Sequence, residues 1–128
     1  MRHDILSDVF TIIRNAESVG KSSCITPASN LVRDILKIMQ KNGYIGSFEY
    51  IDDGKGGKFK IELIGKINKC GVIRPRLPVR KDEIINYEKR FLPSVNIGFL
   101  LLTTSKGVMD HRQAKKEKIG GHLLGYIY

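Results

Sequence analysis

The sequence predicts an α+β protein in which two small α/β subdomains pack together. Helical periodicity and short strands share the first half of the 128 residues, whereas the second half favours strands with short helices. The charge changes at the same point, because residues 1–64 hold 9 Lys and Arg against 8 Asp and Glu, and residues 65–128 hold 13 against 5. We therefore expect an N-terminal α-β-α-β-β subdomain over 1–65 and a basic, mainly β subdomain over 66–128.

The first helix is predicted from apolar residues that recur at helical spacing between Ile5 and Ala16. Asp4 is expected to cap this helix, and Gly20 is expected to end it. A short strand should follow over 23–26, where the next residue is a proline. The order of these elements predicts the start of a small α/β unit.

A second helix is expected after Ser29, a residue type that caps helices, and the Asn-Gly pair at 42–43 should end it. Two strands are expected over 44–51 and 59–64, joined by the glycine-rich stretch DDGKGGK at 52–58. This stretch lacks the GxxxxGKS or GxxxxGKT spacing of a phosphate-binding loop, and it leads into a strand rather than a helix. We therefore expect a hairpin turn there rather than a nucleotide site.

The second half is predicted to alternate short strands with short helices. Residues 65–81 contain two prolines, so any strand within them should lie at a sheet edge or be irregular. A short helix is expected over 82–91, with its first residue, an aspartate, as the cap. The most apolar strand is expected over 97–102, a short cationic helix over 110–118 and a final strand over 123–128.

The composition favours a polyanionic partner, most commonly a nucleic acid. The net charge is +9, the pI is near 9.7, and residues 65–81 hold six cations and no acids. The alternative is charge that serves solubility alone, but solubility does not require cations to cluster. No apolar run approaches the length of a membrane span, and no signal peptide is expected. Cys24 and Cys70 lie far apart, as in a cytosolic protein with two reduced thiols.

An enzyme is the least favoured class. Ser105, Asp110 and His111 are the residue types of a hydrolase triad, but neighbouring side chains on one short helix point about 100° apart and do not form a relay. No GxSxG motif is present. The spacing of metal ligands is absent among the three histidines, His3, His111 and His122, and the two cysteines, so we expect surface or capping histidines, no metal and no cofactor.

A group of polar residues follows the predicted buried strand and forms the main candidate site. Its members are Thr103, Thr104, Ser105, Lys106 and Gly107. Hydroxyls and backbone amides at a strand end can contact phosphates, sugars or base edges, and glycine allows another backbone to approach closely. The next helix adds Arg112, Lys115 and Lys116, and its N-terminal amides would favour a phosphate. The alternative is an ordinary polar loop with Asp110 as a helix cap.

Several segments of the chain resemble one known family in the correct order. They are IGFLLLTTSKGVMDHRQAKKEKIGGHLLGYIY at 97–128, GKINKCGVIRPR at 65–76, NGYIGSFEYIDDGKGGKFKIELIG at 42–65, RNAESVGK at 14–21 and PAS at 27–29. Together they resemble the small-subunit ribosomal protein eight family in its archaeal and eukaryotic form. The resemblance covers essentially the whole chain.

The resemblance implies a structural constituent of the small ribosomal subunit in the cytoplasm, not an enzyme, with neither a membrane nor a small-molecule substrate as partner. It implies direct binding to the central domain of small-subunit rRNA, early in assembly, beside neighbouring ribosomal proteins. The family's hydroxyl motif lies against an irregular RNA core, which here implies Thr103, Thr104, Ser105 and Gly107. By the same resemblance, four residues of the first half contact a second RNA segment: Arg14, Asn15 and Lys21, with Ser29 nearby.

Two questions stay open at the level of the sequence. The same surface could bind a messenger that mimics the rRNA site, so an RNA-binding translational repressor is the alternative function. Tyr126 and Tyr128 could stack on a base or pack on the sheet. We expect packing for at least one of them, because Leu124, Tyr126 and Tyr128 should share one strand face.

Overall fold

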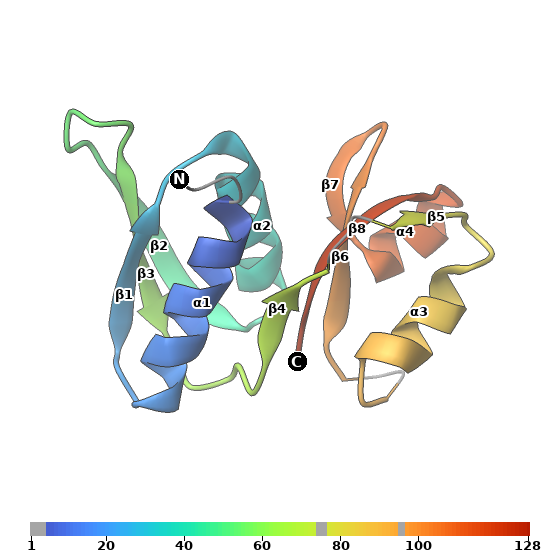
Figure 1. Ribbon diagram of the computed structural model, residues 1–128, viewed down its shortest axis with the longest axis horizontal. Coiled ribbons are helices and arrows are strands. Elements are labelled where there is room, and N and C mark those ends of the chain that lie inside the picture. The colour runs from blue at the N-terminus through green and yellow to red at the C-terminus, as the bar shows by residue number, and fades with distance from the viewer. Residues whose placement is uncertain (1–4, 74–76, 95–96) are drawn as a thin grey trace. The chain divides into compact units, whose positions relative to one another are not determined.

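The computed structural model describes residues 5–73, 77–94 and 97–128, and these form four helices and eight strands in an α+β arrangement (Figure 1). The chain divides into two compact units, which comprise residues 1–69 and 70–128. The division therefore falls after Lys69, a few residues beyond the position expected from the charge pattern. The predicted helix cap at Asp4 and the histidine at position 3 lie outside the described residues.

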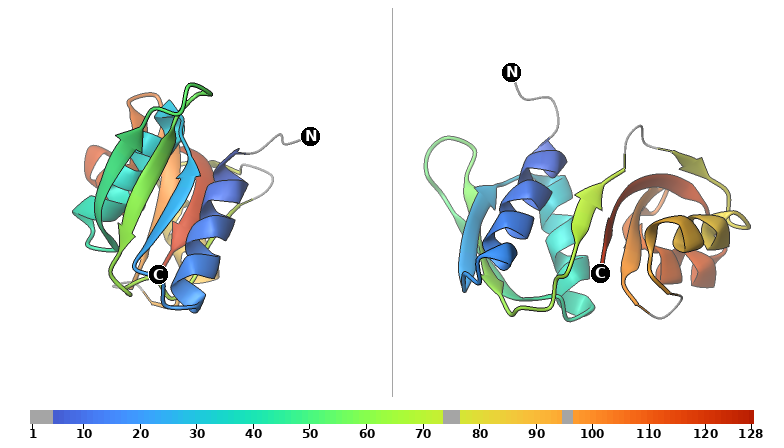
Figure 2. Two further views of the ribbon diagram at one scale, coloured as in Figure 1. Left: turned by 90° about the vertical axis from the view of Figure 1, so that its left-hand side faces the viewer. Right: turned by 60° about the horizontal axis from the view of Figure 1, so that its bottom comes forward.

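Unit 1 is a three-stranded antiparallel sheet with two helices. Its elements are α1 (Ile5–Ser18), β1 (Ser23–Pro27), α2 (Asn30–Lys41), β2 (Ile45–Ile51) and β3 (Lys58–Leu63). The strand order is β1-β3-β2, and both helices lie on the same side of the sheet (Figures 1 and 2). The predicted α-β-α-β-β order is confirmed, and the apolar positions of α1 and α2 that define their helical periodicity are buried or half-buried.

Local hydrogen bonds explain where the elements of unit 1 begin and end. The Ser29 hydroxyl accepts a hydrogen bond from the Val32 amide at 3.1 Å, which confirms it as the cap of α2. In the turn between β2 and β3, the Asp53 carboxylate accepts from the amides of Lys55 and Gly57. These bonds lower the pKa of Asp53 below its ordinary value. The stretch 52–58 is therefore a hairpin turn, as expected.

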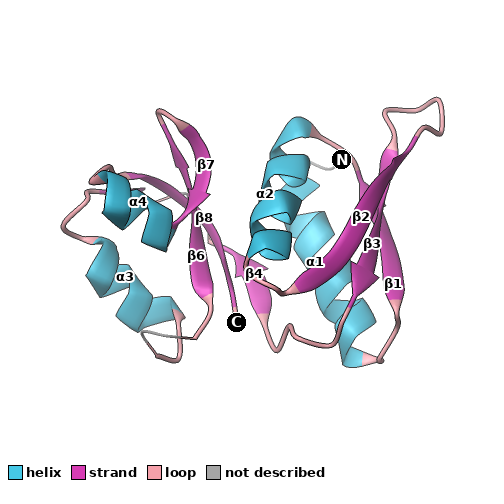
Figure 3. Cartoon of the chain, turned by 180° about the vertical axis from the view of Figure 1, so that it is seen from behind, coloured by secondary structure: helices cyan, strands magenta, loops and turns pink. Residues whose placement is uncertain are grey.

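Unit 2 is a five-stranded antiparallel sheet with two short helices. Its elements are β4 (Cys70–Val72), β5 (Pro78–Val79), α3 (Ile84–Phe91), β6 (Phe99–Thr104), β7 (Gly107–Asp110), α4 (His111–Glu117) and β8 (Gly121–Ile127). The strand order is β4-β8-β6-β7, and β5 also pairs with β8. One of the two interior strands, β8, is therefore the last described strand in the sequence. Figure 3 shows α3 and α4 on one side of this sheet.

Apart from the start of β8, which lies at Gly121 rather than at residue 123, three of the predicted boundaries in unit 2 were wrong. Helix α3 begins at Ile84 rather than at Asp82, and Glu83 stands at its N-cap position without a side-chain capping bond. The Glu83 carboxylate instead accepts from the Arg80 amide at 3.2 Å, so it stabilises the turn before the helix. Strand β6 begins at Phe99 rather than at residue 97, because Gly98 has a positive φ of 79° that breaks an extended chain.

The third correction concerns the stretch that follows the apolar strand. Thr103 and Thr104 continue β6, where they pair with Val108 and Gly107 of β7. Strand β7 was not predicted from the sequence. The stretch 103–107 is therefore the end of a β-hairpin rather than a free loop, and only Ser105 and Lys106 lie between the paired residues.

One face of the unit 2 sheet carries the hydrophobic core under the two helices. Leu100 and Leu102 of β6 pack there with Ile84 of α3, Ala114 of α4 and Leu123 of β8. A register shift in the pairing of β8 with β6 lies between the partners of Leu101 and Leu102. The extra residue at this bulge brings Leu123, rather than the expected Leu124, onto the face that contains the two tyrosines.

The tyrosines near the end of β8 pack within unit 2. The Tyr126 ring stacks on Phe91 of α3, with ring centroids 5.8 Å apart, and it also stacks on Tyr128 at 6.1 Å. Both rings are half-buried against the core. The expectation that at least one of them packs on the sheet is confirmed.

Two adjacent glycines allow β8 to start close to its neighbours. A Cβ on Gly120 would overlap the Val79 carbonyl oxygen, and a Cβ on Gly121 would overlap the Thr103 carbonyl oxygen. Both clashes would be with backbone atoms, which cannot move away by a change of rotamer as a flexible side chain can. The glycine pair thus fixes the distance between β8 and the base of the β6–β7 hairpin.

Candidate nucleic-acid interface

The tip of the β6–β7 hairpin presents an unpaired hydroxyl. Ser105, Lys106 and Gly107 are exposed, and the strand behind them is fully buried from Phe99 to Leu102. The Ser105 hydroxyl has no hydrogen-bond partner among the residues that the structure describes. Gly107 adopts a φ of 110° with open space beside its Cα, so another molecule can approach its backbone closely.

Thr104 differs from Ser105 because its hydroxyl is already engaged. Its Oγ1 donates to the Gly107 carbonyl oxygen at 2.8 Å and accepts from the Lys106 amide at 3.1 Å. The side chain of Lys106 is also held, since its Nζ lies 3.7 Å from the Glu117 carboxylate of α4. Of the predicted hydroxyls at the tip, Ser105 is therefore the one presented outward, while Thr103 is half-buried on the paired strand.

The start of α4 is occupied by its own cap. Asp110 accepts from the Gln113 amide at 2.7 Å, which confirms the prediction of a capping aspartate. One of the amides that could have received a phosphate is thereby satisfied by a carboxylate of this chain. A polyanion would therefore bind the cationic side chains of α4 rather than its N-terminus.

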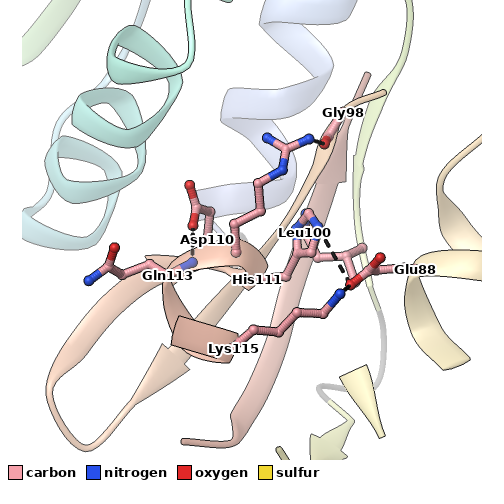
Figure 4. Close-up of polar contacts among 8 residues, drawn as sticks. Glu88, Gly98, Leu100, Asp110, His111, Gln113 and Lys115 are labelled. Carbon is pink, nitrogen blue, oxygen red and sulfur yellow. Dashed lines mark hydrogen bonds and ion pairs between the residues drawn. The ribbon is translucent and has the colours of Figure 1, made fainter. Parts of the chain in front are cut away.

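Two of the three predicted cations of α4 are engaged inside unit 2. The guanidinium of Arg112 donates to the Gly98 carbonyl oxygen at 3.0 Å. Lys115 forms an ion pair with Glu88 of α3, a carboxylate that is only 4% exposed (Figure 4). A buried carboxylate requires such a partner, because an unpaired buried charge is costly. Lys116 is exposed and makes no ion pair with the described residues.

His111 is a buried core residue, so the expectation of surface or capping histidines was wrong at this position. Its Nδ1 accepts from the Leu100 amide at 3.0 Å, and its Nε2 lies 3.7 Å from the Glu88 carboxylate (Figure 4). Burial lowers the pKa of His111 to about 4, against the raising influence of Glu88. The ring is therefore neutral at pH 7, as its acceptor role at Nδ1 requires.

The candidate residues of unit 1 lie in two places. Arg14 and Asn15 are exposed on α1, and Lys21 is exposed in the turn that follows this helix. Asn15 and Lys21 line the same groove beside β1. Ser29 does not line that groove, and its hydroxyl caps α2. The structure thus brings Asn15 and Lys21 together but separates them from Ser29 within the unit.

Both cysteines are buried, and neither forms a disulfide. Burial, with a further contribution from Glu17, raises the pKa of the Cys24 thiol to about 11, so the thiol stays protonated and unreactive at neutral pH. Within the described residues, no group of three or more His, Cys, Asp and Glu side chains could hold a metal ion. None of the described helices is long and apolar enough to cross a membrane.

Clustered Lys and Arg residues are typical of nucleic-acid-binding proteins, and the excess positive charge of this chain lies in residues 65–128. The family model described as "Ribosomal protein S8" matches residues 4–128. The small ribosomal subunit protein uS8 of Methanococcoides burtonii (strain DSM 6242 / NBRC 107633 / OCM 468 / ACE-M) is 52% identical over 126 residues, which are 98% of this chain and 97% of the relative. The chain therefore belongs to the ribosomal protein S8 family.

This membership confirms the resemblance inferred from the sequence motifs. The family is one of structural, RNA-binding proteins of the small ribosomal subunit rather than one of enzymes. The protein is accordingly a ribosomal protein of the translation machinery, and the expected location on the cytoplasmic ribosome follows.

We predict that acid weakens the fold through His111. Because its folded-state pKa of about 4 lies below the ordinary value of 6.5, the unfolded chain binds the proton first as the pH falls from about 6.5 towards 4. The free energy of unfolding should therefore fall by on the order of 1–2 kcal/mol between pH 6.5 and 5. Urea unfolding at several pH values measures this fall.

The matched variants are His111→Asn and His122→Asn. The asparagine at 111 keeps an oxygen acceptor for the Leu100 amide but does not titrate, so this part of the pH dependence should disappear. His122 is exposed on β8, and its replacement should leave the pH dependence as in the parent. Equal pH dependence in His111→Asn and the parent would contradict the assignment.

Proposed function

We propose that this protein binds directly to the central domain of small-subunit rRNA and aids the assembly of the subunit at an early stage. In this proposal unit 2 makes the principal RNA contact, and neighbouring small-subunit ribosomal proteins are its further partners. The observation that carries the proposal is the hairpin tip at the end of the buried segment Phe99–Leu102, where the Ser105 hydroxyl has no partner among the described residues and the backbone of Gly107 is open.

The chemistry of the tip suits an irregular RNA core. Regular double-stranded RNA hides its base edges in a deep and narrow groove, so proteins read bulged bases, 2′-hydroxyls and shape instead. A serine hydroxyl is short, neutral and able both to donate and to accept, and glycine adds no side chain that would hold the RNA away. A tip with such small residues can approach the bases of an irregular RNA core more closely than a long, charged side chain could.

The surrounding charge supports affinity rather than recognition. Residues 65–128 carry 13 Lys and Arg against 5 Asp and Glu, and cations that neutralise phosphates bind any RNA with similar strength. Lys116, with no partner in the described chain, is the cation of α4 best placed for this role. Asn15 and Lys21 of unit 1 would serve a second, smaller contact with RNA through the groove that they share.

Footprinting of purified small-subunit rRNA with the purified protein tests the proposal. Protection confined to a helix of the central domain, in the absence of any other ribosomal protein, is the expected result. Protection only after other ribosomal proteins have been added would show that the protein is not a primary binder. Protection confined to another domain of the rRNA would refute the proposed site.

Replacement of Lys116 by glutamine should weaken binding to all RNAs alike. The loss of one phosphate contact should reduce the slope of log affinity against log salt concentration by about 0.7–0.9. Filter-binding titrations at several salt concentrations measure the slope. Lys37→Gln, which removes an exposed lysine from α2 of unit 1, is the matched control and should leave the slope unchanged. An unchanged slope in Lys116→Gln would remove Lys116 from the interface.

Replacement of Ser105 by alanine should impair discrimination instead. Because the hydroxyl carries no charge, the salt slope should stay as in the parent, whereas the lost hydrogen bond should cost about 1–3 kcal/mol of binding to the cognate RNA helix. Affinity for unrelated duplex RNA and the melting temperature should change little, since Ser105 is exposed and has no partner in the described chain. Equal losses for cognate and unrelated RNA would show that the tip is not a recognition element.

A further inference from the structure

Strand β2 forms one edge of the unit 1 sheet and pairs only with β3 among the described strands (Figure 3). Two backbone hydrogen bonds show which residues of β3 bond to the strand on its other side. The Ala28 amide donates to the Gly57 carbonyl oxygen at 3.3 Å, and the Leu63 amide donates to the Ser22 carbonyl oxygen at 2.9 Å. The odd-numbered residues of β3 therefore bond to β1 and its even-numbered residues to β2, because successive residues of a strand alternate between its two edges.

The backbone groups of Phe48 and Tyr50 consequently point away from the sheet. Glu49 is the partner of the even-numbered Lys60, so its backbone bonds to β3, and the residues on either side of Glu49 face the opposite edge. No hydrogen bond joins the backbone of Phe48 or Tyr50 to the described chain at this edge. Two amides and two carbonyl oxygens, at the spacing of an extended strand, thus remain for another molecule.

The side chains at this open edge are apolar. Tyr50 is 57% exposed and Ile51 is 38% exposed, and they lie on opposite faces of the sheet because strand residues alternate. Proteins usually block such an edge with lysine or proline, since an open apolar edge pairs readily with another strand. Strand β1, at the other edge, ends at Pro27, which has no amide to donate. Strand β2 contains neither a lysine nor a proline.

The charge around β2 favours a polypeptide over RNA. Residues 45–58, which comprise β2 and the turn to β3, hold three acids and two lysines, so this segment has a net charge of −1 in a chain of +9. A polyanion gains little from such a segment. An extended polypeptide, in contrast, carries alternating amides and carbonyl oxygens that match those of an open strand edge.

We propose that β2 is a docking edge for an extended segment of another small-subunit ribosomal protein, which adds a fourth strand to the unit 1 sheet. The segment exchanges hydrogen bonds with the backbone of Phe48 and Tyr50, and its apolar side chains cover Tyr50 and Ile51. That the partner is a ribosomal protein rests on the proposed function, in which neighbouring proteins of the small subunit are further partners. The docking edge itself does not depend on the RNA contact of unit 2.

Hydrogen exchange in the free protein and in small subunits reconstituted with it tests for the added strand. The Phe48 and Tyr50 amides should exchange at least about tenfold more slowly in the subunit, because each gains a hydrogen bond there. The Glu49 amide is the internal control, since its bond to β3 should keep it slow in both samples. Equally fast exchange of the Phe48 and Tyr50 amides in the free protein and in the subunit would overturn the proposal.

A photo-crosslinking residue in place of Ile51 identifies what lies against β2 in the reconstituted subunit. Attachment to an extended segment of a ribosomal protein is the expected result. Attachment to rRNA, attachment to a second copy of this chain or the absence of any product would overturn the proposal.

Two matched lysine variants test the role of the apolar edge. Tyr50→Lys, which places a charge where the partner packs, should lower the yield of this crosslink about fivefold or more. Ile25→Lys is the control, because Ile25 is similarly exposed, at 52%, but lies on β1 at the opposite edge, and its yield should stay as in the parent. Equal yields from Tyr50→Lys and the parent would overturn the proposal. Loss of the rRNA footprint of the parent protein would refute the proposed function alone, since the crosslink does not depend on it.

Discussion

The architecture of unit 2 depends on the complete burial of β6. Four successive residues, Phe99 to Leu102, expose none of their surface, and a buried strand must have all of its backbone polar groups paired. Strand β8 supplies partners along one edge and β7 along the other. After β7 ends at Asp110, the ring of His111 accepts from the next amide of β6, that of Leu100. A side chain thus completes the hydrogen bonding at the position where the neighbouring strand has ended.

The same constraint explains the special residues around the strand. Gly121 lets β8 approach the Thr103 carbonyl oxygen, and Gly98 turns the chain into β6 with a positive φ. Arg112 donates to the carbonyl oxygen of Gly98, which fastens α4 to the start of the strand. The hairpin tip consequently stands on a support that has little freedom to move. Recognition by a few small groups requires such a support, because a shift of about 1 Å is enough to break a hydrogen bond.

Much of the fold could be predicted from the sequence where the signals are local. The helices of unit 1 follow from a periodic apolar pattern, and Ser29 and Asp110 cap helices with their own side chains. Strand β7 could not be predicted, because four residues are too short to show an alternation, and its existence depends on pairing with β6. The bulge at Leu124 was also missed, since it arises from the register between two strands and not from either segment alone.

The candidate site shows the same division between local and tertiary information. Exposure of Ser105, Lys106 and Gly107 follows from a polar stretch after an apolar one. The partners of Lys115 and Lys106 do not follow from sequence, because Glu88 and Glu117 lie far along the chain and the fold brings them close. The number of Lys and Arg residues in a segment therefore overstates how many of them are available to bind a ligand. Glu88 and Glu117 were missed for this reason, and no sequence pattern marks them.

The position of β8 has a consequence for the order in which the chain can fold during synthesis. All described strands and helices of unit 1 come from residues 5–63, so they are synthesised before those of unit 2. In unit 2, β8 is the last of the described strands to be made, and β4, β5 and β6 all pair with it. Until Gly121–Ile127 has been made, β6 can pair with β7 along one edge, but the strand that pairs with its other edge is missing. The half of the molecule that we propose holds RNA is thus the half that a newly made chain completes last.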